Sequence, residues 1–157
     1  MSDWTAPAFT TALTASLAAR AGITDLTDPK VRVLDYWPSA DEGITDAIIV
    51  GYQAEDSTEH VAIGNQSQDE TVTVHCEIRV VRPGAGQTVA TACRTRAAFL
   101  LGEVADELRE AAPDVGDQTV FARTDNRDLV QFPSTAGATA VRVCLIEFDV
   151  VYKARTS

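Results

Sequence analysis

The sequence predicts an α+β fold, in which a mixed, mainly antiparallel sheet carries two principal helices packed on one side. Three observations support this prediction. Residues 71–82 alternate between apolar and polar side chains, a long amphipathic helix follows from residue 88 to about residue 112, and the whole chain runs helix, several strands, helix, several strands. Elements that come in such blocks are typical of helices gathered on one face of an antiparallel or mixed sheet.

The strand at residues 71–82 has the period of a half-buried β-strand. One of its faces is expected to build the core, and the other to meet water or a neighbouring molecule. The first face carries Val72, Val74, Cys76, Ile78 and Val80, and the second carries Thr71, Thr73, His75, Glu77 and Arg79.

The long helix has apolar residues at every third or fourth position, while most of its charged residues fall off this stripe. The stripe must therefore lie against the sheet. It consists of Val89, Cys93, Ala97, Leu100 or Leu101, Val104 and Leu108.

The other elements follow from the same patterns. A first helix is expected from a cap at Thr5 or Asp3, with Pro7 in its first turn, to a left-handed C-cap at Gly22. Strands are predicted at residues 31–37, 47–52, 119–123, 129–132 and 140–152, with residues 59–64 compatible with a further short strand. The last strand has apolar residues on both faces, which indicates a central place in the sheet. Residues 39–46 are expected to form an acidic loop, and residues 53–58 and 124–128 polar turns.

Length and composition predict one domain over residues 1–157, with 45% hydrophobic and 23% charged residues. No apolar run approaches the roughly 18 residues of a membrane span, and the start of the chain does not resemble a signal peptide, so synthesis and folding in the cytoplasm are expected.

The net charge of −10 lies entirely in residues 1–78, which carry 3 basic and 13 acidic residues. Such a surface repels phosphate backbones, so direct or sequence-specific nucleic-acid binding is disfavoured.

No motif in the chain predicts catalysis, a cofactor or a metal. The glycines at residues 83–88 lack the spacing and the lysine of a phosphate loop, and residues 125–128 lack the glycine and distal glutamate of a calcium loop. His75 and Cys76 point to opposite faces of one strand, and His60 has no metal-ligand spacing. The three cysteines are expected to be buried structural thiols, and the sequence does not support an enzyme.

Taken together, several features resemble the tail terminator proteins of long-tailed bacteriophages, over nearly the whole chain. These are the alanine-rich first helix, the Val33-Leu34-Asp35-Tyr36-Trp37-Pro38 strand with its acidic loop, the polar run at residues 64–70 that leads into the strand at 71–80, the helix with Arg94-Thr95-Arg96 and residues 100–109, and the closing valine-rich strand.

The resemblance implies a structural protein of the virion, at the tail end at the neck. Its hexameric ring would cap the tail tube, end tube growth and join the tail to the head connector, with assembly in the host cytoplasm. The expected partners are further copies of the chain, the tail tube protein and the head–tail connector protein, without a cofactor or a membrane.

A ring needs an interface in which one patch of each subunit meets a different patch on the next. The acidic first half of one subunit is expected to face arginines of the neighbouring subunit. The loops at residues 41–46 and 65–70 are predicted to contact the tail tube or the connector. If these loops instead line the lumen of the ring, their charge would repel DNA. The predicted contact residues are Asp41, Glu42, Asp46, Asn65, Gln66, Gln68, Asp69, Glu70, Arg79, Arg94, Arg96, Arg123 and Arg127.

Two other functions remain open from the sequence. A head-closure or neck protein of the same assembly region would share the acidity and the ring habit. A small α+β enzyme would need a pocket in which polar groups converge.

Overall fold

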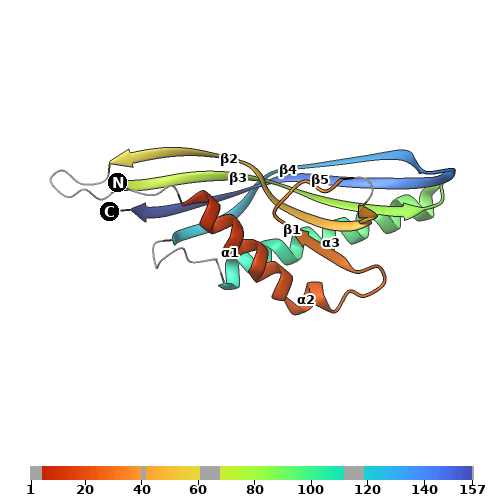
Figure 1. The fold of residues 1–157 in the computed structure, drawn as a ribbon, viewed down its shortest axis with the longest axis horizontal. Helices are drawn as coiled ribbons and strands as arrows, with labels where there is room; N and C mark the ends of the chain where they lie inside the picture. Colours follow the sequence, from red (N-terminus) through yellow and green to blue (C-terminus); the bar gives the residue numbers. More distant parts are fainter. Residues whose placement is uncertain (1–4, 40–41, 61–67, 112–118, 157) are drawn as a thin grey trace.

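The computed structural model describes residues 5–39, 42–60, 68–111 and 119–156. Five strands form one sheet in the order β1-β2-β3-β5-β4, and the helices all lie on one side of it (Figure 1). The strands are β1 Val31–Leu34, β2 Asp46–His60, β3 Gln68–Pro83, β4 Thr119–Ala136 and β5 Thr139–Thr156. Only β1 and β2 pair in parallel, so the predicted α+β fold with a mainly antiparallel sheet is confirmed.

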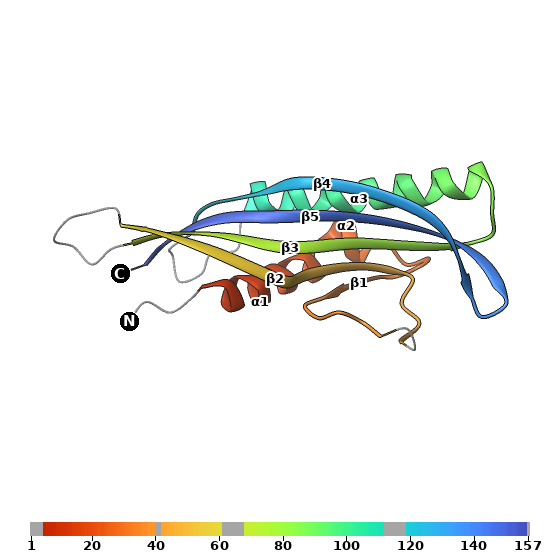
Figure 2. The ribbon, with the colours of Figure 1, turned by 90° about the horizontal axis from the view of Figure 1, so that it is seen from above.

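In the part of the chain that the structure describes, three helices cover the sheet: α1 Ala6–Ala19, the short α2 Ala21–Thr24 and α3 Gln87–Ala111. The first, α1, contacts β1, β2 and β3, whereas α3 contacts β3, β4 and β5, so the two long helices share the width of the sheet (Figure 2). The predicted central place of the last strand is also confirmed, because β5 lies between β3 and β4. No helix in the described residues is long and apolar enough to cross a membrane.

Two turns predicted from polar residues are instead parts of long strands. Residues 53–58 continue β2, after a shift in register between Ile49 and Gln53 that accommodates Gly51 at φ +71°. Residues 124–128 form a bulge inside β4, where Asn126 has φ +49°. Residues 53–58 pair with β3, and Thr124, Asp125 and Asp128 pair with β5 on either side of the bulge. Strand pairing therefore keeps polar residues in strands that their composition alone does not favour.

The first helix ends earlier than predicted. Its C-cap is Arg20, in an extended conformation, and Gly22 lies within α2. The guanidinium of Arg20 donates to Glu103 at 2.5 Å, Glu107 at 2.8 Å and Glu110 at 3.1 Å, all on α3. This contact between α1 and α3 needs the chain to turn at Arg20. A Cβ at Gly22 would lie 2.3 Å from the Glu103 carboxylate, so glycine leaves room for that carboxylate and does not form a left-handed cap. The first edge strand is also shorter than predicted, because only residues 31–34 pair with β2.

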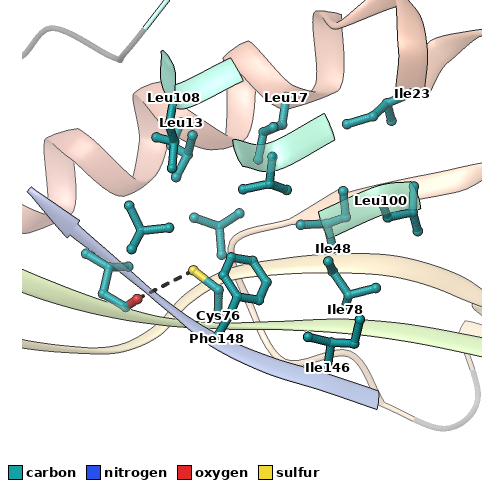
Figure 3. Packing of buried hydrophobic residues seen from close by; sticks show 14 of the residues in the cluster. Leu13, Leu17, Ile23, Ile48, Cys76, Ile78, Leu100, Leu108, Ile146 and Phe148 are labelled. Carbon is teal, nitrogen blue, oxygen red and sulfur yellow. Dashed lines mark hydrogen bonds between the residues drawn. The ribbon is translucent and has the colours of Figure 1, made fainter. Parts of the chain in front are cut away.

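The core lies between the sheet and the helices (Figure 3). Leu13 and Leu17 of α1 and Leu100 of α3 are fully buried against one face of the sheet. The predicted inward faces of the strand at 71–82 and of the long helix are confirmed, with the helix stripe at Cys93, Ala97, Leu100, Val104 and Leu108. The sheet contributes Ile48, Val50, Val72, Val74, Cys76, Ile78, Val80, Cys144, Ile146, Phe148, Val150 and Tyr152.

All three cysteines are free and buried, as predicted. Burial raises the pKa of the Cys76 thiol to about 12, and burial also raises the pKa values of Cys93 and Cys144. Thiolates react with disulfide reagents and thiols do not. At pH 8 far less than one cysteine per folded chain is therefore expected to react, whereas in urea all three cysteines should react. Rapid labelling of a thiol without denaturant would contradict this burial.

Candidate interaction surface

The helices leave the other face of the sheet uncovered, and we call this the open face. Strand alternation and the pairing register assign its side chains. Across β3, β5 and β4 they form rows: Val81, Val143 and Phe132; Arg79, Leu145 and Val130; Glu77, Glu147 and Asp128; and His75, Asp149 and Asp125.

An aromatic cluster covers the open face beside β1. Trp37 is 54% exposed and meets Tyr52 of β2 edge to face, with ring centroids 5.2 Å apart. The Arg79 guanidinium lies over the Trp37 ring at 5.4 Å. Exposed tryptophan, tyrosine and arginine together are typical of the residues that dominate protein–protein interfaces.

A polar network occupies the middle of the open face. His75 Nδ1 lies 2.5 Å from Asp149 Oδ1, and Asn126 donates to Asp149 Oδ2 at 2.8 Å. The network brings no nucleophile to His75, because Cys76 faces the core with a thiol that burial holds protonated. Among the described residues no group of three or more His, Cys, Asp or Glu side chains is arranged to hold a metal ion. The network therefore holds the Asp149 carboxylate in place beneath its neighbours, where Asp149 is 8% exposed.

A belt of carboxylates crosses the open face beside this network. Glu77 is buried under its neighbours and receives a hydrogen bond from Arg79 at 3.1 Å, whereas Glu147 and Asp128 in the same row are exposed. Desolvation raises the pKa of Glu77 above its ordinary value, and the nearby Glu147 adds to this shift, although Arg79 opposes it. The ionised form of Glu77 therefore costs folding free energy.

A Glu77→Gln variant is expected to gain stability relative to the wild-type chain as the pH rises. Folding raises the pKa of Glu77, and this raised pKa contributes to the stability of the folded chain. The contribution is fully present when the pH is below the pKa of Glu77 in the unfolded chain. It is lost as the pH rises through the pKa of Glu77 in the folded chain. Glutamine removes this loss. Urea unfolding of both chains at several pH values from 4 to 7 would measure it, with Glu147→Gln as the exposed control. A stability difference that does not change with pH would contradict the assignment.

The other half of the open face is apolar. Val141 and Val143 of β5 are buried only by their neighbours on the same face, while Val130 and Phe132 of β4 are 43% and 37% exposed. Val130 and Phe132 lie on β4, the edge strand next to β5 (Figure 1), and Val141 of β5 pairs with Pro83 at the end of β3. Exposed apolar side chains next to an 18-residue edge strand are typical of an association surface.

The predicted contact residue Asp46 lies elsewhere than expected. It is the first residue of β2 rather than part of a loop, and its side chain is fully buried on the helix side of the sheet. Arg82 of β3 donates to it at 2.5 and 3.0 Å, and Arg96 of α3 donates at 3.0 Å and also bonds the Pro29 carbonyl at 2.9 Å. The bonds to Asp46 raise the pKa of Arg82 further. Asp46 and Arg96 therefore pair within one chain and tie β1, β2, β3 and α3 together.

The remaining predicted contact residues are spread over the molecule. Arg79 lies on the open face, Arg123 and Arg127 are exposed on β4, and Arg94 is exposed on α3. Glu42 accepts hydrogen bonds from Tyr36 and Ser39 in the segment after β1.

The polar run at residues 65–70 is only partly a loop. Glu70 belongs to β3, is 4% exposed and accepts a hydrogen bond from Thr5 at 2.8 Å, so it fastens α1 to the sheet. Gln68 and Asp69 are paired residues of β3 rather than loop residues. Asp41, Asn65 and Gln66 lie outside the described residues.

Sequence reasoning did not identify several large apolar residues that are exposed in the structure. Trp37, Tyr52, Val130 and Phe132 were all expected in strands, but the pattern did not tell which of them would remain uncovered. A second missed feature is a shallow groove of about 460 Å³ on the outer side of α3, which we call the Phe99 groove. Phe99 is 44% exposed. It is a large aromatic residue outside the apolar stripe of the helix, and this position was the feature of the sequence that could have predicted an exposed site. The groove is lined by Leu26, Ala92, Thr95, Arg96 and Phe99.

Comparison with known proteins gives a fold but no family. No protein-family model matches the chain, and no curated protein matches it. Among solved structures, the chain is similar to one from the virion of a native gene transfer agent particle, with a TM-score of 0.59 over 94% of this chain and 92% of that chain. The two sequences are 15% identical, so what this likeness shows is that a chain of a virion particle has the same fold over nearly its whole length.

Proposed function

We propose that this chain is a structural protein of a phage-type virion, and that it acts as a tail terminator. Copies of it form a ring, proposed as a hexamer, that caps the tail tube, ends tube growth and joins the tail to the head connector. It works by assembly, without turning over a substrate.

The observation that carries this proposal is the fold shared with a chain of a gene transfer agent virion across almost the full length of both. The resemblance of the sequence to tail terminators points to the same class of particle. The open face adds physical support, because it exposes aromatic and apolar side chains that a solitary domain gains nothing from leaving in water. On this face His75 and Asp149 lie within hydrogen-bond distance of each other, and Glu77 is bonded to Arg79.

The proposal is tested by native mass spectrometry and electron microscopy of the purified chain, alone and with tail tubes assembled from the tube protein of the same particle. We expect rings of one size that bind at tube ends and stop further growth of the tube. A chain that stays monomeric at every concentration and does not bind tubes would refute the proposal. Rings that bind the connector but not the tube would instead identify a head-closure or neck protein.

A further inference from the structure

We propose that β4 binds an extended segment of another protein as a further strand of the sheet, along residues 128–132 of its edge. We call this stretch, together with the groove beside it, the β4 edge site. In the described part of the chain β4 pairs only with β5, so the backbone groups on its other side face no strand. An unpaired edge presents a row of N–H and C=O groups that an extended backbone can satisfy along its length. The site goes beyond the proposed function, because it depends on the edge of a single chain and not on ring formation.

The edge is protected at both ends of this stretch but not within it. A bulge interrupts the register between Asp125 and Asp128, and Pro133 has no N–H to donate to a neighbouring strand. Bulges and prolines are devices by which proteins keep edge strands from pairing. Between them Leu129, Val130 and Phe132 are large, apolar and exposed. The bulge and the proline therefore set the ends of a stretch that remains able to pair.

A groove lies on the helix side of the same stretch. The helix α3 runs beside β4 (Figure 2), and a groove of about 370 Å³ between them is bordered by Leu129 and by the small side chains of Ala98 and Ala105. Gly102 borders it as well, and a Cβ added there would meet nothing among the described residues within 4 Å. A strand at the edge places alternate side chains on the two sides of the sheet. The side chain opposite Leu129 would enter this groove, which has room for a large apolar residue.

The charges on the two sides of the edge differ in sign. On the open face Asp128 continues the row of Glu77 and Glu147 across the sheet. On the helix side Arg94 lies beside Gln131, with its guanidinium 3.5 Å from the side-chain amide oxygen. Opposite charges on facing residues of neighbouring strands stabilise their pairing and select its register. A docked strand is therefore matched by a cation opposite Asp128 and by a carboxylate opposite Gln131.

These contacts define the side chains of the partner. Along residues 128–132 of β4 the facing residues are, in turn, basic, apolar, apolar, acidic and apolar. Antiparallel pairing is the more stable kind, and β4 already pairs in this way with β5. Read from its N-terminus, the partner segment is therefore apolar, acidic, apolar, apolar and basic.

A synthetic peptide tests the site directly. The probe is a fluorescently labelled peptide of sequence Ser-Thr-Val-Glu-Ile-Val-Lys-Thr-Ser, titrated by fluorescence anisotropy into the chain at concentrations where native mass spectrometry shows a monomer. We expect saturable binding, and hydrogen exchange should show slower exchange of amides in residues 128–132. A peptide of the same composition with Glu and Lys exchanged should bind roughly fivefold or more weakly, because both charge pairs become repulsive.

Backbone methylation separates strand pairing from general apolar contact. Two further peptides carry methyl groups on alternate backbone nitrogens, one peptide for each of the two alternating sets. In a strand, successive N–H groups point to opposite edges, so only one set faces β4. Methylation of that set should abolish binding, whereas methylation of the other set should leave most of it.

A single variant tests the groove. Gly102→Leu fills the groove from the side of α3, and the open space at Gly102 allows the variant to fold. The affinity for the peptide should fall roughly tenfold or more, because its apolar side chain loses the space opposite Leu129. Ala92→Leu is the matched control, since Ala92 is an exposed alanine of the same helix that lines the Phe99 groove instead, and it should bind as the wild type does. Circular dichroism and urea unfolding verify that both variants are folded.

The outcomes also separate this site from the proposed function. Lack of saturable binding up to about 1 mM peptide would overturn the β4 edge site, as would binding that is indifferent to charge exchange, to methylation and to Gly102→Leu. Protection of residues 128–132 by self-assembly alone, without peptide, would overturn it too, because a second copy would then be the occupant. If the chain binds the peptide as expected but forms no rings and binds no tail tubes, the site stands and the proposed function fails.

Discussion

Replacing Asp46 with alanine is expected to lower the free energy of unfolding by about 3 kcal/mol. The Asp46 carboxylate is fully buried and is the shared acceptor of Arg82 and Arg96, so its loss leaves two largely buried guanidinium groups without their shared carboxylate. Removing one partner of a buried ion pair costs about 3–5 kcal/mol, and the lower end applies because both arginine side chains are 17–20% exposed and can be partly hydrated.

The measurement is urea unfolding at a fixed, low protein concentration, since assembly would add stability of its own. Asp35→Ala provides the control, because Asp35 is an exposed acidic residue in the same half of the chain, and less than about 0.5 kcal/mol should be lost. A ring contact made by Asp46 is a distinguishable alternative. In that case Asp46→Ala would weaken assembly while the unfolding of the dilute chain stayed as in the wild type.

Replacing Phe9 with alanine is expected to cost about 4 kcal/mol, the largest effect of any single change predicted for this chain. Phe9 is fully buried near the start of α1 and stacks on Tyr152 of β5, with ring centroids 3.8 Å apart and planes inclined by 13°. The Tyr152 hydroxyl lies 2.7 Å from the Thr5 hydroxyl, which in turn donates to Glu70. Removing the ring thus leaves a cavity and loosens the hydrogen-bonded contact that docks the start of α1.

Thermal and urea unfolding of Phe9→Ala would measure this cost, with Phe99→Ala as the control. Phe99 is a phenylalanine of the same size on a helix, but it is 44% exposed, so its removal should cost about 1 kcal/mol or less at dilute concentration. Equal losses from the two variants would contradict the assignment of Phe9 to the core and Phe99 to the surface.

The charge asymmetry of the chain shows how far a sequence argument reaches. Residues 1–78 do carry the excess of acidic residues. However, the two halves of the sequence do not form two separate faces of the molecule, one acidic and one basic. On the open face Asp125, Asp128, Glu147 and Asp149 of the second half lie among Glu55 and Glu77 of the first half, while the acidic Asp46 pairs with Arg96 of its own chain. Register decides this, because strand pairing brings residues far apart in sequence onto one row and separates neighbours onto two sides.

The sequence by itself determined the local periods: the alternation of residues 71–82, the apolar stripe of α3, and hence the α+β class with its helices on one side of the sheet. These follow from which side chains must leave water, and that information is local. Only the tertiary structure decided that polar residues 53–58 and 124–128 continue strands, that α1 stops at Arg20, and that Asp46 is buried. Each of these depends on a partner far along the chain, whether a neighbouring strand, the glutamates of α3 or two arginines, and no local pattern specifies such a partner.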